Sequence, residues 1–340
     1  MRTGRASNLP NVAVIIPFFQ ERAGILARSL SSIYAQDVDP HLQIAIVVVD
    51  DGSPLAPTED IDAAGTPPTN VTIRILKRAN GGPAAARNTG LDAVNDVDAI
   101  AFLDSDDIWH PGHLKRGLLA LRRAQLYFAD NEYSLGSRWF DGLSGISRLT
   151  QVASAEGDDI YRIPGDAILP YFLAECIAHT STVIFDARRI ERMRFDEAQA
   201  TAGEDHLFWI SAAARSEHVA FSLRPMASRG HGVDMYRRAL SWDNPECVRR
   251  IYFALMLKKK MLDRFCTTAS EKAMLNMQIG ILRRSIIYLF ARNAISHAKS
   301  NARVFAKLLC TDLGFWLNLP RNAFILVSQK ITGRFEFHIG

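Results

Sequence analysis

Three carboxylates within four residues are the strongest chemical signal in this 340-residue chain. Asp104, Asp106 and Asp107 directly follow the apolar run 99–103. Like charges this close repel one another and raise each other's pKa unless a cation or water lies among them. A hard divalent cation, Mg²⁺ or Mn²⁺, suits oxygen ligands of this kind better than Zn²⁺ does. A merely solvated acidic turn is the simpler explanation for this motif taken alone.

A second acidic pair, Asp50 and Asp51, ends the apolar run 44–49. Over about the first 105 residues, apolar runs alternate with helical patterns, which predicts a parallel sheet with helices on both faces. Ligands of such sheets collect beyond the carboxyl ends of the strands, and these ends share one edge. We therefore expect both acidic clusters to face a common crevice.

Two further features belong to the same edge. The segment 17–20, Pro-Phe-Phe-Gln, follows the first apolar run and offers an aromatic pair suited to a planar base. The segment 80–83, Asn-Gly-Gly-Pro, places glycines ahead of a helix start, where free N–H groups can receive a phosphate. It matches neither the dinucleotide fingerprint nor the P-loop. Together with the acids, these features predict a pocket for a nucleoside diphosphate and a divalent cation.

The elements that must position these residues follow from apolar periodicity and turn residues. The expected strands are 12–16, 44–49, 71–76, 99–103, 126–129 and 179–185. The expected helices are 24–35, 83–94, 112–124 and 204–214, followed by an almost wholly helical region from about 244. The segment 54–70 is expected to be a loop with a short helical turn, and 136–162 an irregular polar loop.

The net charge of +4 hides an asymmetry. Residues 281–334 contain nine Lys or Arg and one acid, Asp312, which gives this region +8 and the rest of the chain −4. A basic region interleaved with large apolar residues favours an interfacial amphipathic surface on a phospholipid membrane. A helical subdomain that packs on the first domain or dimerises explains it equally well. The sequence has no uninterrupted apolar stretch of about 18 residues, so it predicts no membrane-spanning helix.

The four cysteines, 176, 247, 266 and 310, show no metal-binding spacing, and the first ten residues lack the apolar core of a signal peptide. Reduced cysteines suit a cytoplasmic location.

Five motifs in order resemble the family 2 inverting glycosyltransferases over roughly residues 10–235. They are V-A-V-I-I-P-F-F-Q-E at 12–21, V-V-V-D-D-G-S at 47–53, N-G-G-P-A-A-A-R-N-T-G at 80–90, F-L-D-S-D-D at 102–107 and G-E-D-H-L-F-W at 203–209. Gln20 stands where the family usually has Asn. Bacterial exopolysaccharide enzymes of the succinoglycan glucosyltransferase type look most similar.

The resemblance implies a GT-A fold, an α/β nucleotide-diphospho-sugar transferase fold with a Rossmann-like, mostly parallel sheet. It would occupy residues 11–240, between an N-terminal tail (1–10) and a helical, basic region (241–340). The implied donor is UDP-glucose, and the implied acceptor is a glycan or a polyprenyl-diphosphate-linked oligosaccharide. The implied location is peripheral, on the inner face of the plasma membrane, and no nucleic acid partner is expected.

The resemblance also assigns roles. Asp205 would be the catalytic base, with Glu204 beside it, and Asp106 would bind the metal together with His231. The implied nucleotide-binding residues are Pro17, Phe18, Phe19, Glu21, Asp50, Asp51, Gly82, Arg87, Asp104 and Ser105.

Several of these residues also have a purely structural explanation. Glu204 and Asp205 would complement the dipole of the helix that they begin. His231 lies in a Gly-flanked loop, where a histidine is as often incidental. Trp109 and His110 either line the sugar site or pack.

Two other functions compete with glycosyl transfer. One is a sugar-phosphate nucleotidyltransferase, which usually carries a Gly-rich signature with a basic residue near the first strand. The segment 18–20, Phe-Phe-Gln, offers none. The other is a non-catalytic protein that binds membrane or nucleic acid through its basic region.

Overall fold

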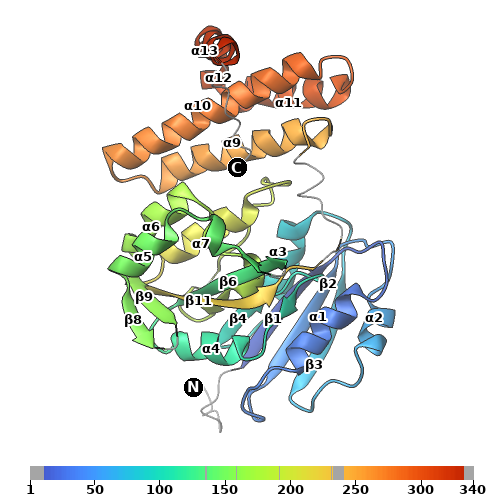
Figure 1. Ribbon diagram of the computed structural model, residues 1–340. Helices are drawn as coiled ribbons and strands as arrows, with labels where there is room; N and C mark the ends of the chain where they lie inside the picture. The colour runs from blue at the N-terminus through green and yellow to red at the C-terminus, as the bar shows by residue number, and fades with distance from the viewer. Residues whose placement is uncertain are drawn as a thin grey trace. The chain divides into compact units, whose positions relative to one another are not determined.

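The computed structural model describes residues 11–134, 136–157, 159–190, 192–230, 232 and 241–332. The chain divides into two compact units, drawn with their helices and strands in Figure 1. The first unit contains residues 1–197 and 208–233, and the second contains 198–207 and 234–340. The short segment 198–207 thus groups with the C-terminal helices.

Four parallel strands form the first half of the sheet, in the spatial order β3-β2-β1-β4. They are β1 (Val12–Phe18), β2 (Ile44–Asp50), β3 (Val71–Lys77) and β4 (Ala99–Phe102). The strands β1 and β4 are almost wholly buried, as expected of strands covered on both faces. Phe18 lies opposite Asp50 in the register, so the ends of β1 and β2 are level. All four strands begin within a residue of their expected positions.

The helices α1 (Ile25–Tyr34), α2 (Thr58–Ala63) and α3 (Pro83–Ala93) connect these strands. Pro83 occupies the first turn of α3, where its missing N–H group costs no hydrogen bond. Gly90 lets α3 approach β1 closely, because a Cβ there would lie 2.4 Å from Ile15 Cγ2. The close approach packs the second half of α3 against β1.

The second half of the sheet is mixed. The short strand β10 (Ile184–Asp186) lies antiparallel between β4 and β6 (Leu126–Ser134), and β11 (His218–Ser228) runs parallel to β6. The remaining strands are antiparallel to their neighbours: β5 (Ile108–Trp109), β7 (Ser137–Arg138), β8 (Ser154–Gly157) and β9 (Ile160–Pro164). The helical elements of this half are α4 (His113–Ala120), η1 (Phe140–Gly142), α5 (Ile146–Val152), α6 (Gly165–Ala174), η2 (Thr180–Thr182) and α7 (Glu204–Ala214).

Two expectations for this half were wrong. The segment 136–162 contains β7, η1, α5, β8 and part of β9 and is not an irregular loop. The segment 179–185 is a strand only at its end, since Thr180–Thr182 form a 3-10 turn. The Thr182 hydroxyl donates to Ala129 O at 2.9 Å and accepts from Ala129 N at 3.2 Å. This side chain thus satisfies both backbone groups of Ala129, so the strand need not extend further.

The second unit contains five helices among its described residues. They are α9 (Glu246–Arg264), α10 (Ala269–Arg292), α11 (Ala298–Thr311), α12 (Leu313–Leu317) and α13 (Leu319–Ile331). The helix α10 begins with a capping box between Thr268 and Glu271. The apolar core of this unit includes Ile251, Ile286 and Phe315. Of the helices that the structure describes, none combines the length and the apolarity needed to cross a bilayer.

Candidate active site

The carboxyl ends of β1, β2 and β4 are joined by one buried residue, Gln20, which is 3% exposed. Its Nε2 donates to Ser105 Oγ at 2.9 Å, and its backbone N–H donates to Ser53 Oγ at 2.8 Å. The backbone N–H of Ser53 donates in turn to Asp50 Oδ1 at 2.8 Å. The expected crevice residues of three strand ends are therefore brought together. Neither Gln20 nor Ser53 was predicted to do this, although both directly follow strand ends.

Asp51 is buried and holds the Gly-rich segment. Its two carboxylate oxygens accept from Gly81 N at 3.0 Å and Gly82 N at 2.7 Å, and Arg78 Nε lies 3.2 Å away. Burial raises the pKa of Asp51, and these three groups oppose the rise. Since both amides are bonded to Asp51, the phosphate cradle expected of them is replaced by an internal anion. The backbone N–H of Gly82 thus helps to hold the Asp51 carboxylate in place.

The aromatic pair divides into two roles. The Phe18 side chain is 2% exposed and belongs to the hydrophobic core, and its expected contact with the nucleotide stays a prediction. Phe19 and Pro17 are half-buried, and Glu21 is exposed. The alternation of a strand explains the difference, because neighbouring side chains point to opposite faces.

Arg87 lies beside Asp104. Its Nη2 donates to Asp104 Oδ1 at 2.8 Å, and its guanidinium lies 5.3 Å from the centre of the Phe195 ring. Burial by itself would raise the pKa of Asp104, but the Arg87 charge and hydrogen bond bring this pKa below its usual value. Asp104 therefore stays ionised, and its negative charge raises the pKa values of Asp106 and Asp107.

The pKa of Asp106 is raised to about 6 by burial and by the neighbouring charges of Asp107 and Asp104. Asp106 Oδ2 accepts one hydrogen bond from Gly232 N at 2.9 Å, which opposes the rise. The carboxylate is therefore poised to gain a proton or a cation.

Asp107 is the most deeply buried of the three acids, at 2% exposed. It accepts from Ser181 Oγ at 2.5 Å and from Gly230 N at 3.0 Å, and His179 Nδ1 lies 3.9 Å away. Burial and the Asp104 charge raise its pKa to about 7. Sequence reasoning left Asp107 without a role, and nothing in the sequence near Ser181 signals the contact. The geometry makes Asp107 a positioning residue that joins the acidic turn to two other segments.

The segment after β11 needs glycine at both of its contacts with the acidic turn. A Cβ at Gly230 would lie 1.5 Å from the Asp106 carbonyl oxygen, and one at Gly232 would lie 2.6 Å from Asp106 Oδ2. His231, expected to bind the metal, is between them and lies outside the described residues.

The donor atoms of the acidic turn fit a hard divalent cation. They are carboxylate oxygens, and burial and neighbouring acids raise the pKa values of Asp106 and Asp107, so a bound cation would stabilise their ionised forms. Within the described ranges, no group of three His, Cys, Asp or Glu side chains is arranged to hold a metal by itself. Ligand oxygens and water would therefore have to complete the coordination.

The expected catalytic pair begins α7. Glu204 is buried and Asp205 is half-buried, and Asp205 Oδ1 accepts from His206 N at 2.7 Å. Both residues belong to the segment that groups with the C-terminal helices. A Cβ at Gly203, which has a φ of 84°, would lie 2.6 Å from Leu257 Cδ2 of α9. The first turn of α7 is thus seated on the helical unit.

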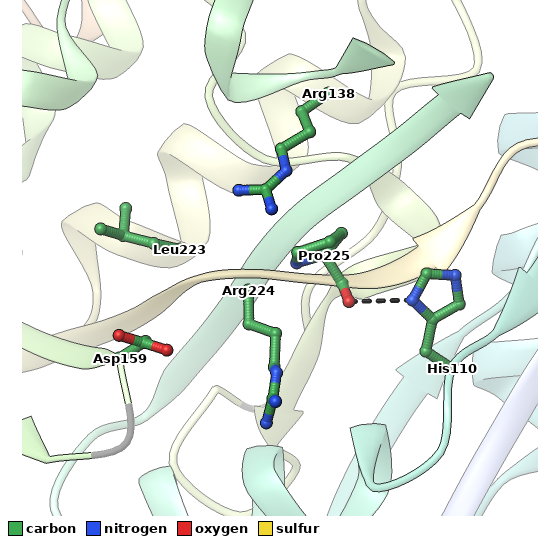
Figure 2. A pocket seen from close by; sticks show the side chains of 6 residues that line it. All are labelled: His110, Arg138, Asp159, Leu223, Arg224 and Pro225. Atoms are coloured by element: carbon green, nitrogen blue, oxygen red, sulfur yellow. Dashed lines mark hydrogen bonds between the residues drawn. The ribbon is translucent and has the colours of Figure 1, made fainter. Parts of the chain in front are cut away.

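An open pocket of about 440 Å³ lies beside β11. Figure 2 shows the Nδ1 atom of His110 bonded to the carbonyl oxygen of Pro225 at its rim, at 2.9 Å. The lining residues are His110, Arg138, Asp159, Leu223, Arg224 and Pro225. Of these lining residues, only His110 was named as a candidate from the sequence.

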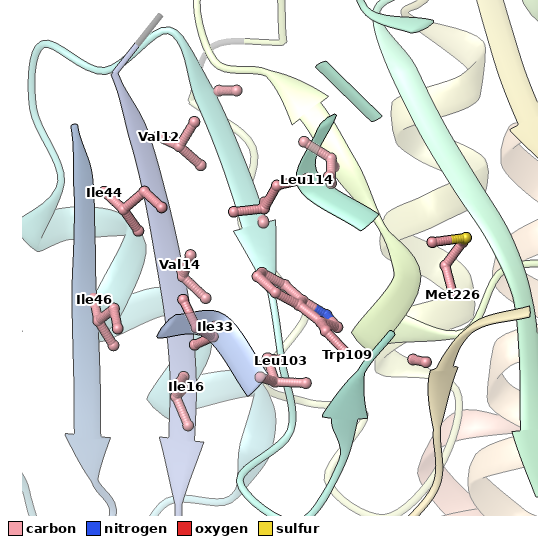
Figure 3. Packing of buried hydrophobic residues seen from close by; sticks show 14 of the residues in the cluster. Val12, Val14, Ile16, Ile33, Ile44, Ile46, Leu103, Trp109, Leu114 and Met226 are labelled. Atoms are coloured by element: carbon pink, nitrogen blue, oxygen red, sulfur yellow. The ribbon is translucent and has the colours of Figure 1, made fainter. Parts of the chain in front are cut away.

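Trp109 packs, which answers the question that the sequence left open. Its side chain lies within the core beside Leu103 and Leu114 (Figure 3). Its Nε1 donates to Ser181 O at 2.6 Å, and its ring centre lies 4.8 Å from that of His113. Trp109 therefore holds the backbone of Ser181, whose hydroxyl donates to Asp107.

Comparison with known proteins agrees with this geometry. The model of the family "Glycosyl transferase family 2" matches residues 13–151. The succinoglycan biosynthesis protein ExoW of Rhizobium meliloti is 30% identical over 248 residues, which cover 71% of this chain and 75% of that protein.

Solved structures share the fold at low identity. Staphylococcus aureus TarS in complex with UDP-GlcNAc has a TM-score of 0.53 and 14% identity, over 97% of this chain and 94% of that chain. The mannosyltransferase PcManGT from Pyrobaculum calidifontis, in complex with GDP-Man and Mn²⁺, has a TM-score of 0.55 and 17% identity, over 97% and 89%. The fold is GT-A, and the protein is a glycosyltransferase. The chain belongs to glycosyl transferase family 2.

Proposed function

We propose that this enzyme is an inverting glycosyltransferase that moves glucose from UDP-glucose to a hydroxyl of a growing, lipid-linked bacterial exopolysaccharide. The observation that carries the proposal is the acidic turn 104–107, where one acid is neutralised by Arg87 and two have raised pKa values. Uncompensated negative charge of this kind favours a cation and the diphosphate that the cation brings.

The nucleotide half of the donor is assigned to the joined strand ends. Phe19 is the aromatic side chain available to the base, together with Pro17 and Glu21 at the same turn. Asp50 would accept a hydrogen bond from the base, and Asp51 would keep the Gly-rich segment in place. The ribose and the sugar are assigned to Asp104, with Ser105 and Arg87 holding it in position.

A divalent cation, Mg²⁺ or Mn²⁺, fits the acidic turn. When bound, it supplies Lewis-acid stabilisation of the negative charge that grows on the departing diphosphate. Asp106 would hold it, and we assign His231 as a second ligand. The PcManGT structure was solved with Mn²⁺, which supports this type of cofactor.

The acceptor hydroxyl needs a base, because its pKa lies far above 7. Asp205 would take the proton as the hydroxyl attacks the anomeric carbon from the face opposite the leaving diphosphate, which inverts the configuration. A positioned base contributes about 10²–10⁴-fold to such a step. Glu204, adjacent and more buried, would hold the helix start in place.

The relative named for succinoglycan biosynthesis supports a polysaccharide acceptor, and we propose that this acceptor is lipid-linked. A polyprenyl-diphosphate-linked oligosaccharide is confined to a membrane, so we place the enzyme peripherally on the inner face of the plasma membrane.

The test is UDP release by the purified full-length chain across a panel of UDP-sugars, with and without EDTA. UDP-glucose should be the best substrate, and EDTA should stop its turnover until Mg²⁺ or Mn²⁺ is restored. Asp106→Asn and Asp205→Asn should each lower turnover by about 10²-fold or more, whereas Asp37→Asn, whose side chain is 78% exposed, should not. Turnover that persists in EDTA contradicts the metal assignment, and a different best donor contradicts the assignment of glucose.

A further inference from the structure

The helices α11, α12 and α13 leave large apolar side chains in water. Of the eleven exposed large hydrophobic residues among the described residues, six lie in these three consecutive helices. Two of them, Leu317 and Phe324, are 73% and 75% exposed. The six are Phe305, Leu309, Leu313, Leu317, Phe324 and Val327, which we call the apolar stripe.

The stripe follows helical spacing. Its members are separated by four residues in α11 and in α12, and by three in α13, so each pair shares one helix face. Leu308, Phe315 and Leu326 of the same helices are buried. Each helix therefore has one apolar side in the core and further apolar residues in solvent, which its own packing does not explain.

Aromatic contacts join the first two helices at the stripe. The ring of Phe305 lies 4.8 Å from that of Trp316 and 6.2 Å from that of Phe290. Trp316 and Phe290 are half-buried, and the Trp316 Nε1 donates to Leu308 O at 3.2 Å. Aromatic residues with one polar and one apolar side favour the boundary between water and hydrocarbon.

The charges around the stripe have one sign. Lys299, Arg303, Lys307 and Arg321 are exposed. The only acid between residues 298 and 332 is Asp312, which is buried and bonded to Arg283 and Lys259. Burial lowers the pKa of the Arg284 guanidinium, and the nearby Arg321 charge lowers it further. The described residues of α11, α12 and α13 thus combine apolar area with positive charge and contain no exposed acid.

We propose that the apolar stripe and its four exposed cations form a docking surface for an anionic lipid bilayer, with the three helices lying in its interface. Apolar side chains that enter the acyl boundary and cations that face anionic headgroups are the two terms that bind an interfacial helix. A second copy of this chain fits less well, because a two-fold interface would set the same cations against one another. Nucleic acid would attract the cations but leave the aliphatic side chains unused.

This inference goes beyond the transfer reaction and does not depend on it, because it is tested without donor or acceptor. The full-length protein is mixed with vesicles of phosphatidylcholine and with vesicles in which phosphatidylglycerol replaces part of the lipid. Binding is measured by co-sedimentation at low and high salt. We expect binding to the anionic vesicles that is at least about tenfold stronger than to the neutral ones and that weakens with salt.

Two sets of variants separate the two contributions. Leu313→Ser, Leu317→Ser and Phe324→Ser together should lower vesicle binding about tenfold or more, as should Lys299→Gln, Arg303→Gln and Arg321→Gln together. The matched controls change exposed residues of the first unit: Leu119→Ser with Val152→Ser, and Arg28→Gln with Arg122→Gln and Arg215→Gln. The controls should bind as the wild type does.

Two outcomes overturn the proposal. One is equal binding of wild type and stripe variants to anionic vesicles. The other is a wild-type protein that does not bind vesicles but sediments as a dimer, with the stripe variants monomeric, which assigns the surface to a second copy. UDP release from soluble donor, measured on the same variants, reports separately on the transferase.

Discussion

At the scale of single residues, the site places one ionised carboxylate next to two carboxylates that resist ionisation. Arg87 keeps Asp104 charged, and that charge helps to raise the pKa of Asp106 to about 6 and of Asp107 to about 7. Three chemically identical side chains in four residues thus differ in protonation at neutral pH because their surroundings differ.

The contribution of Asp106 and Asp107 to the stability of the metal-free protein should therefore decrease as the pH rises from about 4 to about 7. In this window the folded state holds protons on these two carboxyls that the unfolded state has released, since the pKa of Asp107 is raised from 3.8 to about 7 in the fold. Asp107→Asn removes one of the two raised groups and should flatten this dependence. The measurement is the melting temperature against pH in EDTA.

Asp37→Asn is the control for this experiment, because its side chain is 78% exposed. It should leave the pH dependence as in the wild type. An Asp107→Asn protein whose melting temperature depends on pH as that of the wild type does would contradict the raised pKa of Asp107.

Part of this site could be predicted from residue types alone. The acids at the strand ends and Arg87 are recognisable because they directly follow apolar runs or lie in a familiar motif. The roles of Gln20, Ser181 and Asp107 could not be predicted, because each depends on which strand ends and turns meet in space. For the same reason, the sequence could not show that the Gly82 amide donates to the Asp51 carboxylate.

At the scale of elements, the segment after β11 closes onto the acidic turn through backbone amides. Gly230 and Gly232 donate to two successive carboxylates, and their missing side chains make the approach possible. Backbone donors carry no charge of their own, so they orient the acids without neutralising them.

Gly230→Ala and Gly232→Ala should each lower kcat/KM for UDP release by about 10²-fold, the cost of a catalytic group displaced by about 1 Å. The added Cβ would overlap the Asp106 carbonyl oxygen or its carboxylate, so the segment must move away. Gly142→Ala is the matched control, because a Cβ there meets nothing within 4 Å. Melting temperatures should show that all three variants fold. Unchanged kinetics in Gly230→Ala would show that the segment does not position the acids.

The elements differed in how well the sequence predicted them. The strands β1, β2 and β4 are largely continuous apolar runs, and β3 alternates apolar and polar residues over most of its length, so local pattern was sufficient. The strand β8 has no such pattern, since most of its residues are exposed and it lies at the sheet edge. Just before β10, the Thr182 hydroxyl takes the place of backbone ladder hydrogen bonds, and this exchange depends on Ala129 of another strand.

At the scale of the whole molecule, the segment that carries Asp205 belongs to the helical unit and the acidic turn to the other. The helical unit is held by a buried acid, Asp312, which binds Arg283 at 2.6 and 2.9 Å and Lys259 at 2.9 Å. Burial opposes the ionised form, but these two cations bring the pKa of Asp312 below its usual value. Its contribution to stability is therefore present above about pH 4 and is lost as the pH falls further.

Asp312→Asn should destabilise the helical unit by about 3–5 kcal/mol, because it leaves two partly buried cations without their anion. Hydrogen exchange should show lost protection in α9 and α10, with β1 and β2 protected as in the wild type. Asp243→Asn breaks an exposed pair with Arg292 and should cost only about 0–1 kcal/mol. Equal protection of α10 in both variants would contradict the structural role of Asp312.

The order of strands in the sheet has a consequence for synthesis. The first residue of β6, Leu126, pairs with Phe185 of β10 and Val219 of β11, both of which are translated later. At about 5–20 residues per second, β6 waits about 5–20 s for β11 to be made. Its apolar start, Leu-Tyr-Phe-Ala, has neither neighbour until β10 is made and lacks β11 for the rest of that interval, and long-range pairing of this kind folds slowly. The nascent chain therefore presents an unpaired apolar strand to the chaperones of the cell for as long as this interval lasts.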